Sequence, residues 1–109
     1  MANLSTHVLD QYHGRPAKGV RIRLYTSASP EPLAEVVTNA DGRVDQPMIE
    51  GGKGGPVQLV FDIGEYFNSQ GVDSPFLERV PVWCTLQEDG RYHVPLLVTP
   101  WAYSVYRGS

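Results

Sequence analysis

The sequence predicts an all-β fold, an antiparallel β-sandwich with one short α-helix. Apolar and polar residues alternate in several short segments, which is the period of strands with one buried face. Turn residues separate these segments, since most of the 11 Gly and 9 Pro fall between apolar stretches. Only one segment has the start and stop residues of a helix. Seven or eight short strands with a single helix are typical of a sandwich.

The first half of the chain contains three strand candidates, of which residues 20–26 show the clearest pattern. In VRIRLYT the aliphatic side chains point one way, and the arginine and tyrosine side chains point the other. Residues 4–10 alternate as well, and residues 33–38 follow a proline-rich break. The Asp-Gly pairs within residues 39–42 and 89–90 predict turns, because Asp-Gly favours positive φ, and the second pair indicates a hairpin.

The second half contains four further strand candidates and the helix. Residues 50–56 (EGGKGGP) are expected to form a loop, and the phosphate-binding type is disfavoured because no Ser or Thr follows the lysine. The helix is expected over residues 62–70, where Asp62 and Glu65 have the spacing of a capping box and Gly71 provides a stop. The remaining strand candidates are residues 57–61, 80–86, 92–98 and 102–106.

Length, charge and cysteine content limit the classes of function. The chain has 109 residues, which fits a single domain over residues 1–109. Its net charge of −3, from 9 Lys and Arg against 12 Asp and Glu, offers no basic surplus for binding nucleic acid. No apolar run is long enough to cross a membrane and no leader pattern is visible, so we expect a cytoplasmic protein without a membrane partner. The lone Cys84 cannot form an internal disulfide and lies on an apolar strand face.

Two of the three histidines lie inside predicted strands. His7 belongs to residues 4–10 and His93 to residues 92–98, whereas His13 lies in a turn and is expected to be exposed. A strand histidine is usually structural, but imidazole is also the natural general base near neutral pH, because its ordinary pKa is about 6.5. The alternation leaves open whether the face that carries His7 meets the core.

No metal site or cofactor is predicted. The chain has no HxH, HExxH or CxxC spacing, and the GxSxG motif of serine hydrolases is absent. Arg43 directly follows a predicted turn, where it is either a solvated turn residue or a clamp for an anion or carbonyl group. Residues 103–109 are rich in aromatic side chains, which indicates a packed tail, for instance against another subunit.

Several segments of the chain form a pattern when they are taken together. They are LSTHVLD and GRPA near the start, TNADGR, the stretch from Phe61 to Gly71 that continues into SPFL, YHVPLLV, and the terminal YRGS. Each segment alone is a weak signal, but their order and their spread over nearly the whole chain are specific. The chain resembles the hydrolase branch of the transthyretin-related family.

This resemblance implies a transthyretin-like β-sandwich of two four-stranded sheets with one short α-helix, in agreement with the strand pattern. It implies cofactor-free hydrolysis of 5-hydroxyisourate, an unstable product of urate oxidation, to 2-oxo-4-hydroxy-4-carboxy-5-ureidoimidazoline. The resemblance further implies a homotetramer, a dimer of dimers, with active sites at the dimer–dimer interface. The terminal tetrapeptide of the family helps to form each site.

By position, His7, Arg43 and His93 match the catalytic residues of the family. One histidine, and His7 in preference, is expected to accept a proton from the attacking water, although the sequence does not rank the two rings. Arg43 is expected to hold the substrate and stabilise the oxyanion, and His93 to orient the substrate or pass the proton to the leaving nitrogen. His7 and Arg43 are expected to bind substrate together with the residues that match the terminal motif, namely Tyr106, Arg107, Gly108 and Ser109.

Other classes of protein share the sandwich, so the fold alone does not decide the function. A hormone carrier like vertebrate transthyretin needs an apolar channel and has no use for two histidines and an arginine in one pocket. A structural or adhesive domain would need a signal peptide or neighbouring domains. A metal-dependent hydrolase would need a third ligand beside His7 and His93. The candidate site residues favour the metal-free hydrolase.

Overall fold

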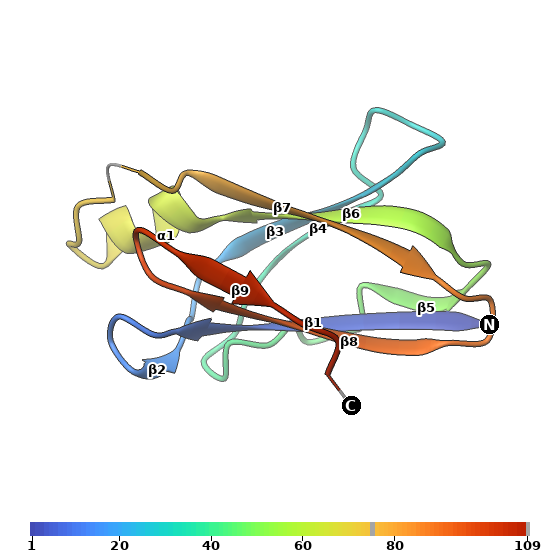
Figure 1. Ribbon diagram of the computed structural model, residues 1–109, viewed down its shortest axis with the longest axis horizontal. Helices are drawn as coiled ribbons and strands as arrows, with labels where there is room; N and C mark the ends of the chain where they lie inside the picture. Colours follow the sequence, from blue (N-terminus) through green and yellow to red (C-terminus); the bar gives the residue numbers. More distant parts are fainter. Residues whose placement is uncertain (75, 109) are drawn as a thin grey trace.

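The computed structural model describes residues 1–74 and 76–108, which form two β-sheets packed face to face with one short helix near one end (Figure 1). The sandwich expected from the sequence is confirmed. The β1 sheet consists of β1 (Ala2–Asp10), β2 (Arg15–Pro16), β5 (Ile49–Gly52), β8 (Arg91–Val98) and β9 (Tyr103–Val105). The β3 sheet consists of β3 (Arg21–Thr26), β4 (Ala34–Val37), β6 (Gly55–Asp62) and β7 (Arg79–Leu86). The helix α1 (Ile63–Ser69) directly follows β6.

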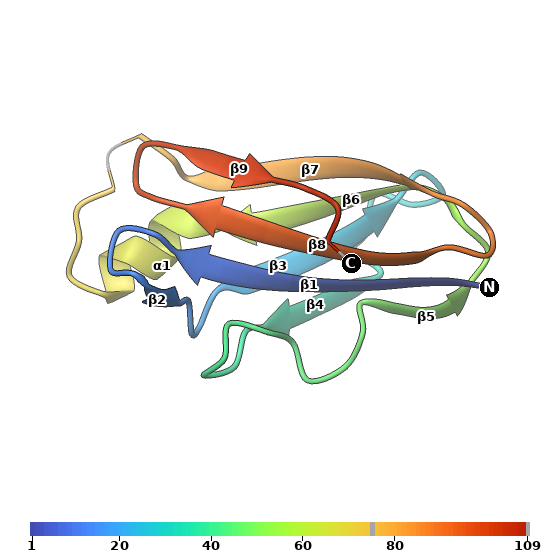
Figure 2. The ribbon, with the colours of Figure 1, turned by 60° about the horizontal axis from the view of Figure 1, so that its bottom comes forward.

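The β1 sheet differs in two respects from the expected antiparallel four-stranded sheet. Its strand order is β2-β1-β8-β9, and β5 is a fifth strand that pairs with the start of β1. β1 and β8 run parallel, as their arrowheads in Figure 2 show, with Ser5 opposite His93 and His7 opposite Pro95. A parallel pair needs a long connection, and here the chain crosses to the β3 sheet and back twice between these two strands, first through β3 and β4 and then through β6 and β7.

The β3 sheet agrees with the sequence-based expectation. It has four strands in the order β4-β3-β6-β7, and every pair in it is antiparallel. The register places Leu24 opposite Leu59 and Ile22 opposite Phe61, so the apolar face of VRIRLYT meets the apolar face of the next strand.

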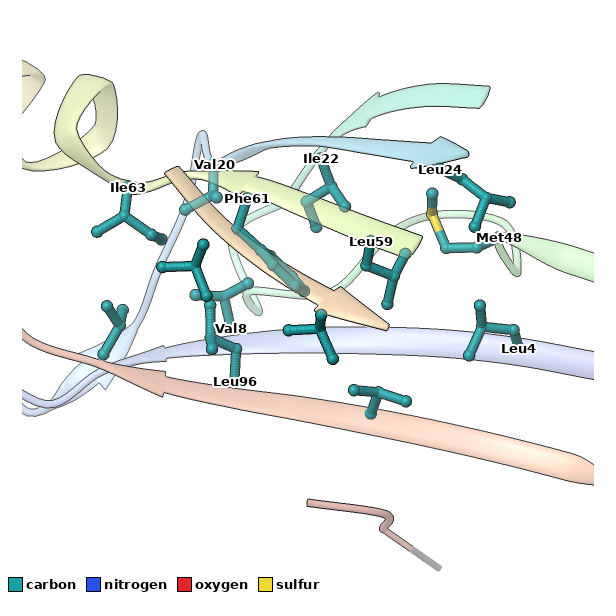
Figure 3. Close-up of a cluster of buried hydrophobic side chains, with 14 of the residues drawn as sticks. Leu4, Val8, Val20, Ile22, Leu24, Met48, Leu59, Phe61, Ile63 and Leu96 are labelled. Atoms are coloured by element: carbon teal, nitrogen blue, oxygen red, sulfur yellow. The ribbon is translucent and has the colours of Figure 1, made fainter. Parts of the chain in front are cut away.

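The hydrophobic core lies between the sheets and is formed by alternate residues of their strands (Figure 3). Along β1 the even-numbered residues are buried and the odd-numbered ones are half-buried, so the core face carries Leu4 and Val8. His7 therefore lies on the opposite face, which settles the question that the alternation left open. Further fully buried side chains are Val20, Ile22, Leu24, Leu59, Phe61, Ile63, Phe67, Val80 and Leu96.

Two turn-rich segments form structures that the sequence did not predict. Residues 50–56 were expected to be a loop, but Ile49–Gly52 is the strand β5, with Gly52 opposite Ala2. Its glycine-rich sequence shows no alternation of apolar and polar residues, so it carries no strand pattern. The segment pairs with β1 through backbone groups. Residues 89–90 do turn, with the Gly90 N–H donating to the Gln87 carbonyl at 3.1 Å, but they link β7 to β8 in the other sheet and form no hairpin.

The helix α1 is present as expected, but its first turn is capped in another way. Asp62 occupies the N-cap position without a capping hydrogen bond, because its carboxylate accepts one from Nη1 of Arg23 at 3.0 Å. The N–H groups of Ile63 and Gly64 instead both donate to the carbonyl of Glu78 at 2.9 Å. In the described residues no helix has the length and apolar character needed to cross a membrane.

A buried carboxylate joins the helix to the end of β1. The Asp10 side chain is fully buried and accepts hydrogen bonds from the Tyr66 hydroxyl at 2.7 Å and the His13 backbone N–H at 2.9 Å. Nδ1 of His13 lies 2.6 Å from the same carboxylate, so this exposed turn residue has its ring tied to the core. Burial by itself would raise the pKa of Asp10, but the hydrogen bonds from His13 and Tyr66 outweigh it and lower that pKa.

Replacing Tyr66 with Phe removes one hydrogen bond from the buried Asp10 carboxylate. We expect the free energy of unfolding at pH 7 to fall by about 1.5–3 kcal/mol, the usual contribution of a hydrogen bond to a charged group, because the contacts of His13 with the carboxylate remain. Because the pKa of Asp10 is lower in the folded chain, the stabilisation is present above its unfolded value and is lost as the pH falls toward the folded value. Urea unfolding at pH 7 and pH 3.5 measures both effects, with Tyr25→Phe on β3 as control. Equal stability of the two variants would contradict this role of Tyr66.

Candidate active site

Two histidines meet on the outer face of the β1 sheet. His7 lies on β1 and His93 on the neighbouring strand β8, and their rings stack with centroids 5.6 Å apart and planes inclined by 26°. Both residues are half-buried. The parallel pairing of the two strands therefore brings together two side chains that are distant in the sequence.

Arg43 is brought beside His7 by the tight turn that precedes it. The carbonyl of Gly42 accepts a hydrogen bond from the N–H of Val8 at 2.8 Å, and Arg43 forms a β-bridge with His7. Oδ1 of Asn39 accepts the N–H of Arg43 at 3.2 Å, which closes the turn. Gly42 has a φ of 73°, and a Cβ there would overlap the carbonyl oxygen of Val8. The turn predicted from Asp-Gly is thus confirmed, and only glycine fits its last position.

The electrostatics of the site keep both imidazoles neutral. Burial and the positive charge of Arg43 lower the pKa of His7 and that of His93 below the ordinary 6.5, and the neighbouring His93 lowers the pKa of His7 further. Each ring is therefore uncharged at pH 7 and has a nitrogen lone pair that can accept a proton. Arg43 itself is exposed, and in the described part of the chain only its backbone takes part in hydrogen bonds, so its guanidinium is open to a ligand.

The two rings differ in the surroundings of Nδ1. Nδ1 of His93 lies 2.8 Å from the hydroxyl oxygen of Ser5. Nδ1 of His7 is buried and has no hydrogen-bond partner among residues 1–74 and 76–108. The two histidines are therefore not equivalent in the folded chain.

The C-terminal tail returns to the strand that carries His93. The N–H of Gly108 donates to the carbonyl of His93 at 2.6 Å, and a Cβ on Gly108 would lie 3.0 Å from Cδ2 of that ring. The guanidinium of Arg107 lies over the ring of Tyr92, 4.2 Å from its centroid, and donates to the carbonyl of Arg91 at 3.1 Å. Arg107 and Gly108 thus contact β8, but the aromatic side chains of the tail, Tyr103 and Tyr106, are exposed in the single chain, so the expected packing is met only in part. Ser109 lies outside the described part of the chain.

A cavity of about 570 Å³ opens beside His93. A second cavity of about 290 Å³ also borders Tyr92, and it is lined by Tyr106 and Arg107 but by neither histidine. Within one chain, Tyr106 is therefore separate from the histidine pair. The polar and aromatic residues that line the larger cavity are Asn3, Ser5, Glu50, Arg91, Tyr92 and His93.

The other titratable residues singled out in the sequence lie elsewhere. His13 binds Asp10, and Cys84 packs half-buried against the core from β7, where burial raises the pKa of its thiol. Among the described residues, no cluster of three His, Cys, Asp or Glu side chains could hold a metal ion. The side chains that meet at the site offer imidazole groups for proton transfer and a guanidinium for charge stabilisation.

Sequence reasoning missed two residues that contact the site. Ser5 alternates with His7 and so shares its face, but its contact with His93 depends on the parallel register, which no local pattern reveals. Tyr92 precedes His93 in the strand, and its contact with Arg107 depends on the return of the tail.

Comparison with known proteins places these features in a family context. A sequence profile of the HIUase/transthyretin family matches residues 4–108. The 5-hydroxyisourate hydrolase of Deinococcus radiodurans is 48% identical over 97% of this chain and 95% of its own length. The structure of Klebsiella pneumoniae 5-hydroxyisourate hydrolase superposes with a TM-score of 0.87 at 36% identity and covers 100% of this chain and 94% of that one. An (S)-allantoin synthase structure gives a TM-score of 0.91 at 43% identity over 99% of this chain, which spans only 44% of that protein.

The coupling of Arg43 to the two histidines can be measured directly. Arg43→Gln removes the positive charge that disfavours imidazolium, so the pKa of His7 and that of His93 should both rise toward the ordinary value. A pH titration of the histidine ring protons by NMR reports both values. Arg21→Gln, which removes an arginine from the outer face of the β3 sheet, should leave them unchanged. Unaltered histidine titrations in Arg43→Gln would contradict the electrostatic coupling.

Proposed function

The chain belongs to the HIUase/transthyretin family, and on this premise we propose that it hydrolyses 5-hydroxyisourate to 2-oxo-4-hydroxy-4-carboxy-5-ureidoimidazoline. The observation that carries the proposal is the convergence of His7, His93 and Arg43 on one face of the β1 sheet. Relatives that bear the hydrolase name align over nearly their full length. Residues 1–109 act as one transthyretin-like hydrolase domain and use no cofactor.

The proposed reaction is the opening of a cyclic amide by water. His7, neutral at pH 7, removes a proton from water while the water oxygen bonds to the ring carbonyl carbon. The bond between that carbon and the ring nitrogen then breaks, and the proton passes to the nitrogen. Water is consumed and no electron acceptor is required. His93 orients the substrate or carries the proton to the nitrogen.

Arg43 has two roles in this mechanism. Its exposed guanidinium holds the substrate and stabilises the negative charge that develops on the carbonyl oxygen. The same positive charge lowers the pKa of both imidazoles, so the base remains unprotonated at neutral pH. One side chain thus prepares the base and stabilises the oxyanion.

The tail and the oligomer complete the proposed site. Arg107 and Gly108 contact the strand of His93, and we assign substrate binding to these two residues together with Tyr106 and Ser109. Because Tyr106 lines a separate cavity within one chain, we propose a homotetramer, a dimer of dimers, with sites at the dimer–dimer interface. Exposed aromatic side chains on β7, on β9 and beside β9 support this association, namely Trp83, Trp101, Tyr103 and Tyr106.

The proposed activity is tested with 5-hydroxyisourate generated freshly from urate by urate oxidase. The wild-type chain should accelerate the ultraviolet decay of this compound in buffer that contains a chelator. His7→Ala and Arg43→Ala should each lower kcat/KM by at least about a hundredfold, because they remove the base and the oxyanion donor. Arg21→Ala, remote from the site, should retain activity. Decay at the spontaneous rate with a folded wild-type chain would overturn the proposal.

Deletion of residues 107–109 tests the role of the tail. The truncated chain loses the contacts of Arg107 and Gly108 with β8, so activity should vanish. The β-sheet circular dichroism should persist, because the core residues lie before the tail. A truncated chain with full activity would show that the tail is not part of the site.

A further inference from the structure

Ser5 makes a specific contact with one of the two candidate catalytic rings. Its hydroxyl oxygen lies 2.8 Å from Nδ1 of His93 although the residues are 88 positions apart. The contact follows from the register of β1 and β8, since Ser5 and His93 are paired and their side chains share the outer face of the sheet. His7 lies on the same face of β1 but is not paired with His93, and its Nδ1 has no partner among the described residues.

The His93 ring is held on several sides. Ser5 occupies its Nδ1 edge, the backbone of Gly108 packs near Cδ2, and the ring of His7 stacks on its face. Of its two nitrogens, only Nε2 remains for a ligand. A cavity large enough for a small heterocycle adjoins this ring, and Ser5 helps to line it.

We propose that Ser5 is a positioning residue, whose hydroxyl donates to Nδ1 of His93 and thereby leaves the ring proton on Nε2. His93 then acts as a neutral hydrogen-bond donor toward the substrate. The inference rests on the proposed function, in which His93 faces the substrate, and it chooses between the two roles left open for this ring.

A proton balance follows from this assignment. An imidazole with no proton on Nδ1 cannot release its Nε2 proton without becoming an anion, which is unfavourable in a half-buried site. His93 therefore orients the substrate and does not carry the proton. His7 takes the proton from water and returns the same proton to the leaving nitrogen, so the enzyme ends the cycle in its starting state.

The tautomer of His93 can be observed without any variant. In wild-type protein labelled with ¹⁵N-histidine, we expect NMR at neutral pH to show Nε2 of His93 protonated and Nδ1 unprotonated. In Ser5→Ala both tautomers of this ring should be populated, because nothing then occupies Nδ1. Protonation of Nδ1 in the wild type would overturn the inference, since Ser5 would then accept and His93 would present a basic Nε2.

Kinetics provide a second test of the Ser5 contact. Ser5→Ala should lower kcat/KM for 5-hydroxyisourate by at least about tenfold, because the donor is no longer fixed in one tautomer. Ser5→Thr restores a hydroxyl at the same place and should recover most of the activity. Ser27→Ala, a serine-to-alanine change in an exposed loop, is the matched control.

The outcomes separate this inference from the proposed function. A wild-type chain without hydrolase activity overturns the function, while the NMR experiment still decides whether Ser5 fixes the tautomer. An active wild type with an unchanged tautomer and unchanged kcat/KM in Ser5→Ala overturns the role of Ser5 alone. If Ser5→Ala fails to fold, the wild-type tautomer and the activity of Ser5→Thr carry the test.

Discussion

The parallel pairing of β1 with β8 is the constraint on which the site depends. It aligns Ser5 with His93 and brings His7 within stacking distance of the same ring. A slip of β1 by one residue would turn His7 toward the core and expose Leu4 and Val8, so the buried face fixes the register. The backbones of these two strands also bind two further segments. Arg43 forms a β-bridge with His7, and Gly108 forms a β-bridge with His93. The pairing of β1 with β8 therefore both stabilises the sheet and sets the geometry of the site.

Local sequence patterns predicted the features that depend on neighbouring residues. The alternation of apolar and polar residues predicted the strands β1 and β3, and Asp41-Gly42 predicted the turn that positions Arg43. The family resemblance singled out His7, Arg43 and His93, and the structure brings these three together. The Asp62 cap was wrong in detail, because the carboxylate binds Arg23 instead of the helix start.

Features that depend on distant pairing could not be predicted from the sequence. The parallel ladder joins strands at opposite ends of the chain, and no local periodicity encodes its direction. β5 was missed because Glu50 and its glycine neighbours have no buried face, although their backbone pairs with β1. The contact of Ser5 with His93 was missed for the same reason, since it exists only once the parallel register is formed.

The core and the site occupy alternate residues of the same strand. Leu4 and Val8 pack in the core between the two sheets. Ser5 and His7 face outward, where we propose that they position His93 and act as the base, respectively. Substitution of the outward residues leaves the buried face intact, so one sandwich can support different functions without a change of fold. Likeness of fold therefore does not decide between a hydrolase and a carrier. The relatives that bear the hydrolase name favour the hydrolase. The half-buried rings of His7 and His93 beside the exposed Arg43 agree with this, because a carrier with an apolar channel has no use for them.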